Sequence, residues 1–161
     1  MQQEVSRFYF CIWSDHVRLI RRPGLGHAAI QLARYIGATV FIATESDAQR
    51  DFLVTGYNIS SDQSFDVHQM YMAEAIKEKT EGRGLDVVFY ASSHGDIARV
   101  VNCLSDFGRF VDVSKTSQPT DCGLRFDRSA PNITYARVDI QVSHPECIAP
   151  CLLTIRSIWR R

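Results

Sequence analysis

Apolar and polar residues alternate along the first hundred residues in a way that predicts strands and helices in turn. A short β-type run at 17–20 meets a glycine turn at Gly24 and Gly26, and a helical pattern follows at once. The apolar face of that helix comprises Ala29, Leu32, Ala33 and Ile36. A second apolar run at 39–43 follows the helix and predicts the next strand. An earlier run at 8–13 predicts either another strand or a docking segment.

The same alternation continues to about residue 113. Helices are expected at 46–55, 71–79 and 97–104, and strands at 86–91 and 108–113. The run at 86–91 is mostly apolar, which is typical of a strand buried on both faces. Successive βα units of this length predict parallel strands with right-handed crossovers. The fold class is therefore α/β, a Rossmann-like doubly wound parallel sheet in a single domain.

Three segments are expected along the chain. Residues 1–15 are predicted to be an N-terminal extension, 16–143 a Rossmann-like dinucleotide-binding domain, and 144–161 a C-terminal helical tail. Within the second segment, proline, glycine and polar residues predict a long loop over 114–131. Alternation over 132–142 predicts a last strand.

Composition narrows the class of protein. Lysine plus arginine equals aspartate plus glutamate at 18 each, so the net charge gives no argument for nucleic acid or an anionic membrane as a partner. No apolar run is long enough to span a bilayer. The five cysteines are odd in number and scattered, which favours reduced thiols and a cytoplasmic protein. The sequence contains no recognisable set of four metal ligands, so no metal site is predicted.

The glycine turn is the first candidate for binding chemistry. Gly24, Leu25 and Gly26 stand immediately before the helical pattern. The start of a helix carries unpaired N–H groups and a partial positive charge, which attract phosphate. Strand, glycine turn, helix and strand in this order are typical of a dinucleotide site.

Three motifs then resemble one family. They are GLGHAAIQLARYIGATVF at 24–41, EGRGLDVVFYASS at 81–93 and CLSDFGRFVDVSK at 103–115. In this order they are similar to the nucleotide-binding half of enoyl reductase domains in fungal highly reducing polyketide synthases. Those domains belong to the medium-chain dehydrogenase/reductase superfamily. The resemblance runs from about residue 16 to about residue 140.

The resemblance implies an oxidoreductase of secondary metabolite biosynthesis. It implies NADPH as the hydride donor and an α,β-unsaturated acyl thioester as the acceptor, which a carrier protein could hold among other synthase domains. Hydride would add to the β-carbon and a proton to the α-carbon. Lys115 and Asp139 match the family's candidate proton donors or charge stabilisers. A lysine cation suits that role because it can stabilise a developing enolate.

The resemblance also implies the cofactor contacts, and several positions depart from it. Ser46 and Arg50 match the segment that holds the 2′-phosphate, and Ser93 matches a position beside the nicotinamide. The lysine of that phosphate segment is replaced by Gln49. Glu45 follows the second strand, where an acid pairs with a ribose 2′-hydroxyl and repels a 2′-phosphate. NADH is therefore an alternative cofactor if Glu45 faces the ribose, and the choice is unaffected if Glu45 faces solvent.

The glycine turn departs from the family as well. Pro23 stands at the second glycine of the G-x-G-x-x-G fingerprint, where it removes an N–H donor. Cofactor binding would then be weak or lost, unless the arginines at 21 and 22 pair with phosphate.

Three functions consequently stay open. The chain could be the nucleotide-binding half of an enoyl reductase. It could instead be a non-catalytic remnant or structural module. A third alternative is a quinone-reductase-like oxidoreductase that a partner completes.

Overall fold

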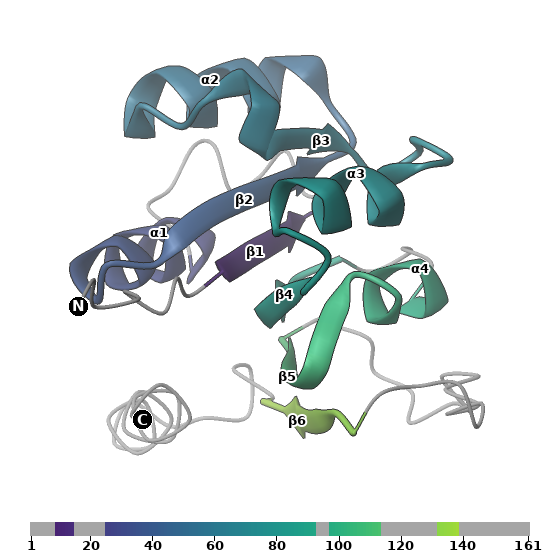
Figure 1. The fold of residues 1–161 in the computed structure, drawn as a ribbon. Helices are drawn as coiled ribbons and strands as arrows, with labels where there is room; N and C mark the ends of the chain where they lie inside the picture. The colour runs from purple at the N-terminus through teal and green to yellow at the C-terminus, as the bar shows by residue number, and fades with distance from the viewer. Residues whose placement is uncertain (1–8, 15–24, 93–96, 114–131, 139–161) are drawn as a thin grey trace, which may run out of the picture.

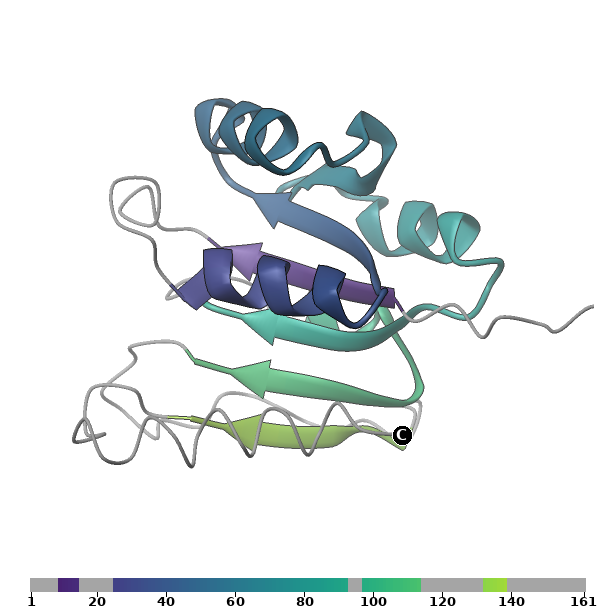
Figure 2. The ribbon, with the colours of Figure 1, turned by 90° about the vertical axis from the view of Figure 1, so that its left-hand side faces the viewer.

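The computed structural model describes residues 9–14, 25–92, 97–113 and 132–138. They form one parallel six-stranded sheet in the order β3-β2-β1-β4-β5-β6, flanked by helices (Figure 1). All the strand arrows point the same way in Figure 2, where α1 lies across one face. This arrangement confirms the predicted Rossmann-like doubly wound sheet in a single domain.

The elements alternate along the chain as expected for βα units. The strands are β1 Tyr9–Ser14, β2 Thr39–Thr44, β3 Ser64–Asp66, β4 Leu85–Tyr90, β5 Leu104–Asp112 and β6 Thr134–Arg137. The α-helices are α1 Leu25–Tyr35, α2 Asp47–Tyr57, α3 Met72–Lys79 and α4 Ile97–Val101, and a 3-10 turn, η2, covers Ser61–Gln63.

The first strand of the sheet corrects the predicted domain start. β1 is Tyr9–Ser14, which lies inside the expected N-terminal extension 1–15 and pairs with β2 and β4 on its two sides. A central parallel strand is buried on both faces and therefore requires an apolar run. Cys11 and Ile12 meet that requirement because both are buried. The strand predicted at 17–20 lies outside the described residues.

Two apolar layers hold the helices against the sheet. On β2, Phe41 and Ala43 face one layer while Val40 and Ile42 face the other, as the two-residue period of a strand dictates. The first layer includes Met72 of α3 and the buried part of α4. The second layer is formed with α1 and α2 and contains Ala29, Ile30, Ala33 and Leu53. The apolar face predicted for α1 is thus a core face at Ala29 and Ala33.

Several element boundaries differ from the predictions. The helix expected at 97–104 ends at Val101, and β5 begins at Leu104 rather than at residue 108. A register irregularity in the β4–β5 pairing accompanies the difference, and Phe107 lies there with φ of 62°. Alternation is broken at such a bulge, so the pattern conceals the early part of the strand.

The ends of the sheet also differ. The segment between the helices expected at 46–55 and 71–79 contains the edge strand β3, and the last strand is Thr134–Arg137 rather than 132–142. The predicted loop 114–131 and the predicted tail 144–161 lie outside the described residues.

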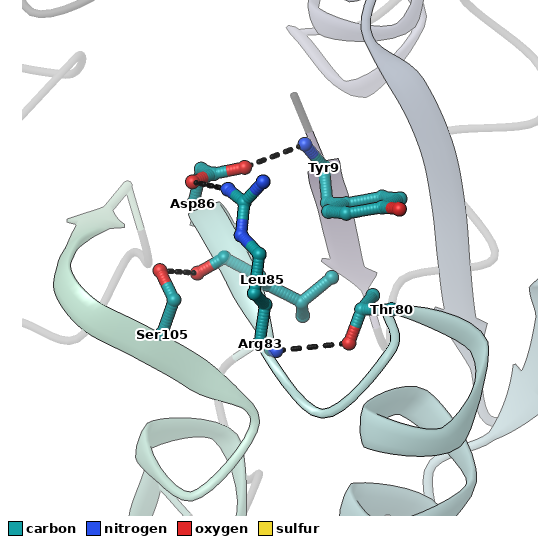
Figure 3. A network of polar contacts seen from close by, with 7 residues as sticks. Tyr9, Thr80, Arg83, Leu85, Asp86 and Ser105 are labelled. Carbon is teal, nitrogen blue, oxygen red and sulfur yellow. Dashed lines mark hydrogen bonds and ion pairs between the residues drawn. The ribbon is translucent and has the colours of Figure 1, made fainter. Parts of the chain in front are cut away.

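A polar network joins three strands at the amino edge of the sheet (Figure 3). The Tyr9 amide donates to Asp86 Oδ2 at 2.8 Å, and Arg83 Nη2 donates to Asp86 Oδ1 at 2.8 Å. Ser105 Oγ donates to the Leu85 carbonyl at 3.1 Å. The starts of β1, β4 and β5 are therefore linked by hydrogen bonds as well as by packing.

Thr80 shapes the turn that leads into β4. Its buried hydroxyl donates to the Ile76 carbonyl at 2.9 Å and accepts from the Gly84 amide at 2.9 Å. Gly84 has φ of +85°, and a Cβ there would lie 2.9 Å from the Cys103 carbonyl oxygen. Only glycine fits this close approach to β5. The acceptor of the Gly84 amide is the Thr80 hydroxyl.

We expect Thr80→Val to destabilise the fold by about 1–3 kcal/mol, because the buried Gly84 amide loses its acceptor. Urea unfolding measures the loss. Thr80→Ser keeps the oxygen and is the matched control. Equal losses in the two variants would contradict the assignment.

Two buried thiols lie in the sheet core. Cys11 and Cys103 are free and buried. Burial raises the pKa of the Cys11 thiol well above its usual value and raises the pKa of Cys103 to about 12. Both thiols therefore stay protonated at a pH where an exposed thiol ionises.

Alkylation at about pH 8.5 should be at least about a hundredfold slower at Cys103 in the native chain than in urea, because only the thiolate reacts. Mass spectrometry of the peptides resolves each cysteine. The same raised pKa makes stability fall as pH rises from the ordinary thiol value of 9.0 toward about 12. Rapid native alkylation of Cys103 would refute its burial.

Candidate functional site

The candidate site is the carboxyl edge of the sheet where β1 and β4 meet. The chain leaves β1 toward α1 and β2 on one side, whereas β4 lies on the other side and leads to β5. The strand order reverses direction between these two strands. In doubly wound sheets, ligands bind in the crevice at this switch point.

The first turn of α1 lies at this edge. The helix begins at Leu25, Gly26 is buried, and no acidic residue occupies the first turn. The partial positive charge of the helix start is therefore not neutralised by a side chain of that turn. This end of α1 is suited to an anionic group.

A ring cluster ties α1 to α2. His27 Nδ1 and Tyr57 Oη lie 2.5 Å apart, and the His27 ring contacts the rings of Phe52 and Tyr57 with centroids at 5.8 and 5.5 Å. Burial raises the pKa of Tyr57 above its ordinary value of 10.0, which itself lies well above neutral pH, so the hydroxyl is available as a hydrogen-bond donor to His27. The cluster holds the first turn of α1 in place relative to α2.

The turn from β2 into α2 forms the second part of the edge. Thr44 is buried, and its hydroxyl donates a hydrogen bond to the Ser46 carbonyl at 3.4 Å. Glu45 lies between these two residues and is exposed. Ser46 occupies the N-cap position of α2 with extended backbone, but its side chain makes no cap hydrogen bond. Arg50 Nη2 pairs with Asp47 Oδ1 at 2.5 Å on the first turn.

Gln49 is the unusual residue of this turn. Its side chain is only 2% exposed, and its Oε1 atom is buried without a hydrogen-bond partner. An unpaired buried acceptor costs about 1–3 kcal/mol. A buried acceptor without a partner calls for an explanation, which a bound water or a ligand group can supply.

The structure brings five of the predicted site residues to one edge. Leu25 and Gly26 begin α1, and Glu45, Ser46 and Arg50 lie at the β2–α2 turn. The other four, Gly24, Ser93, Lys115 and Asp139, lie outside the described residues. The helical prediction at 46–55 agrees with α2 to within two residues.

Sequence reasoning missed the pairing of His27 with Tyr57. The helix predicted at 46–55 stops short of Tyr57, yet Tyr57 is the last residue of α2. No local pattern signals a contact between residues thirty positions apart. A histidine next to the glycine turn was the one available hint.

The described residues fit the polar parts of a dinucleotide. An acid-free helix start suits a diphosphate, and an unpaired buried acceptor with an uncapped helix suits a ribose hydroxyl. Among the described residues, no group of three histidine, cysteine or acidic side chains could hold a metal ion. No helix in the same part of the chain is long and apolar enough to cross a bilayer.

Comparison with known proteins decides the family. The model of the family described as zinc-binding dehydrogenase matches residues 24–144. The chain belongs to this family. The zinc-binding dehydrogenase match covers the segment from the start of α1 to beyond β6.

Curated relatives are fungal polyketide synthases. The chain is 34% identical over 117 residues to squalestatin tetraketide synthase of Phoma sp., covering 73% of this chain. It is 30% identical over 141 residues to the lovastatin diketide synthase lovF of Aspergillus terreus, covering 86% of this chain. It spans 4% and 6% of those two synthases.

Solved structures agree with this family. The nucleotide-binding subdomain of the enoylreductase domain of PpsC from Mycobacterium tuberculosis superposes with a TM-score of 0.69 at 26% identity, over 95% of this chain and 80% of that one. The JamJ enoyl reductase gives a TM-score of 0.64 at 28% identity, over 96% of this chain and 42% of that one. The chain thus corresponds to the nucleotide-binding half of polyketide-synthase enoyl reductase domains.

Tyr57→Phe should lower the free energy of unfolding by about 0.5–1.5 kcal/mol, because it removes the hydroxyl that pairs with His27. Thermal or urea unfolding measures the change. Tyr35→Phe makes the same chemical change on α1 at a side chain that is 88% exposed, and it should leave stability unaltered. Equal effects at the two positions would contradict a bridging role for Tyr57.

Proposed function

We propose that the chain binds a reduced nicotinamide dinucleotide and forms the nucleotide-binding half of an enoyl reductase. The observation that carries the proposal is the strand order β3-β2-β1-β4-β5-β6, with an acid-free start of α1 at its switch point. Membership in the zinc-binding dehydrogenase family and similarity to polyketide-synthase enoyl reductases support it.

Each part of the edge has its own role in this proposal. The first turn of α1, from Leu25 and Gly26, would hold the diphosphate through backbone N–H groups. Glu45, Ser46 and Gln49 would contact the adenosine ribose from the β2–α2 turn. The bridge between His27 and Tyr57 keeps these two binding elements in a fixed relation. A preorganised site of this kind loses less freedom on binding.

The proposed reaction is reduction of an α,β-unsaturated acyl thioester. The bound dinucleotide supplies the hydride that adds to the β-carbon. Lys115 and Asp139 are proposed to stabilise the developing negative charge and to deliver the proton to the α-carbon. The short interval from the end of β5 at Asp112 to Lys115 supports this role, since strand ends of doubly wound sheets adjoin the ligand crevice.

The proposed partners follow from the relatives. The curated relatives are synthases many times longer than this chain. We propose that further synthase domains supply the substrate cleft and deliver the thioester, held on a carrier protein. NADPH is the cofactor that the resemblance implies, with NADH as the alternative. We also propose a cytoplasmic location for the chain.

Titration of the full chain with NADH and NADPH, followed by nucleotide fluorescence, should give a dissociation constant below about 1 mM for at least one of them. Gly26→Val should abolish the signal because it adds bulk at the buried start of α1. Gly56→Val is the matched control, since a Cβ added at that α2 position would meet no atom within 4 Å beyond its chain neighbours and the backbone of its own helix.

Turnover separates the enzyme from a non-catalytic module. Consumption of the dinucleotide with a crotonyl thioester, lost in Lys115→Met, would support the reductase. Dinucleotide binding without turnover, even with the remaining synthase domains present, would favour the non-catalytic alternative. No binding of either dinucleotide would refute the proposal altogether.

A further inference from the structure

The β2–α2 turn carries more negative than positive charge among the described residues. Glu45 is exposed directly after β2, Asp47 begins α2, and Asp66 ends β3 in register with Thr44. Arg50 is the cation of this turn, and it pairs with Asp47 at 2.5 Å. From the side chains of the described residues, a doubly charged anion that approached this corner would therefore meet net repulsion.

The start of α2 does not reverse that balance. Its dipole and uncapped amides alone would attract a phosphate. Asp47 lies in the first turn, however, so a carboxylate already occupies the favourable end of the dipole. Arg50 would have to leave Asp47 to meet a phosphate, and its departure would leave the Asp47 carboxylate uncompensated.

Gln49 points to the kind of group that belongs here. Its Oε1 is buried and lacks a donor. An amide oxygen can only accept a hydrogen bond, so its partner must carry a proton. A ribose hydroxyl carries one, whereas a phosphate near neutral pH is mostly a dianion and rarely has a proton to donate.

We propose that this site selects a dinucleotide with a free ribose 2′-hydroxyl, NADH, over its 2′-phosphorylated form, NADPH. Glu45 and Gln49 are the specificity-determining residues. Glu45 accepts a hydrogen bond from the ribose and repels the extra phosphate. The inference rests on the proposed function, because it requires a nicotinamide dinucleotide at this edge.

Binding of the two dinucleotides to the full chain tests the preference. At low salt, NADH should bind at least about tenfold more tightly than NADPH. Added salt should reduce this difference in affinity, because it screens the carboxylates. Glu45→Gln keeps the shape and removes the charge. The variant should weaken the binding of NADH and strengthen the binding of NADPH, so that the ratio of the two dissociation constants changes by about tenfold toward equality. Asp106→Asn makes the same charge change at an exposed residue early in β5 and should leave the ratio unaltered.

Gln49→Met tests the second residue with two readouts. Removing an unpaired buried acceptor should raise the melting temperature by about 2–4 °C, since the fold no longer carries its cost. The same change should weaken NADH several-fold, because the ribose loses an acceptor. A more stable variant with unchanged NADH affinity would overturn the role of Gln49.

The outcomes distinguish this inference from the proposed function. Equal affinities, or tighter binding of NADPH, would overturn the preference and leave the proposed function standing. An unchanged ratio in Glu45→Gln would overturn the role of Glu45. Failure of both dinucleotides to bind would overturn the inference and the proposed function together.

Discussion

The parallel pairing of β1 between β2 and β4 is the constraint on which the rest of the structure depends. Tyr9 to Ser14 pair with Thr39 to Thr44 on one side, and Phe10 to Trp13 pair with Val87 to Tyr90 on the other. Without this strand the sheet would divide into a β3-β2 pair and a β4-β5-β6 unit. The same pairing aligns the ends of β1, β2 and β4 at one edge, so it creates the switch point as well as the core.

The polar groups at the two edges of that sheet differ in their hydrogen bonding. At the amino edge, Asp86, Thr80 and Ser105 satisfy backbone and side-chain groups through a connected network. At the carboxyl edge, the Gln49 oxygen is buried without a partner and the Ser46 side chain leaves α2 uncapped. Hydrogen-bonded polar groups contribute stability, whereas a buried polar atom without a partner carries a free-energy cost. The proposed site lies at this second edge.

Fold and specificity are separated in this chain. The fold matches the nucleotide-binding half of polyketide-synthase enoyl reductases, with a TM-score of 0.69 to one such subdomain. In the proposed site, the choice of dinucleotide depends instead on a few residues of the β2–α2 turn, chiefly Glu45 and Gln49. Glu45 is exposed at this turn, so its charge can change without disturbing the core.

The sequence by itself determined the alternation of strands and helices, the parallel sheet, β4 as a strand buried on both faces, and the grouping of Glu45, Ser46 and Arg50 at one turn. These follow from local periodicity and from spacing along the chain. Only the tertiary structure decided that 9–14 forms β1, that β5 begins at Leu104, that His27 meets Tyr57, and that Gln49 is buried without a partner. The reason is physical. A local pattern sets which element a segment can form, but competition for a central strand position and contacts between distant residues are settled by long-range packing.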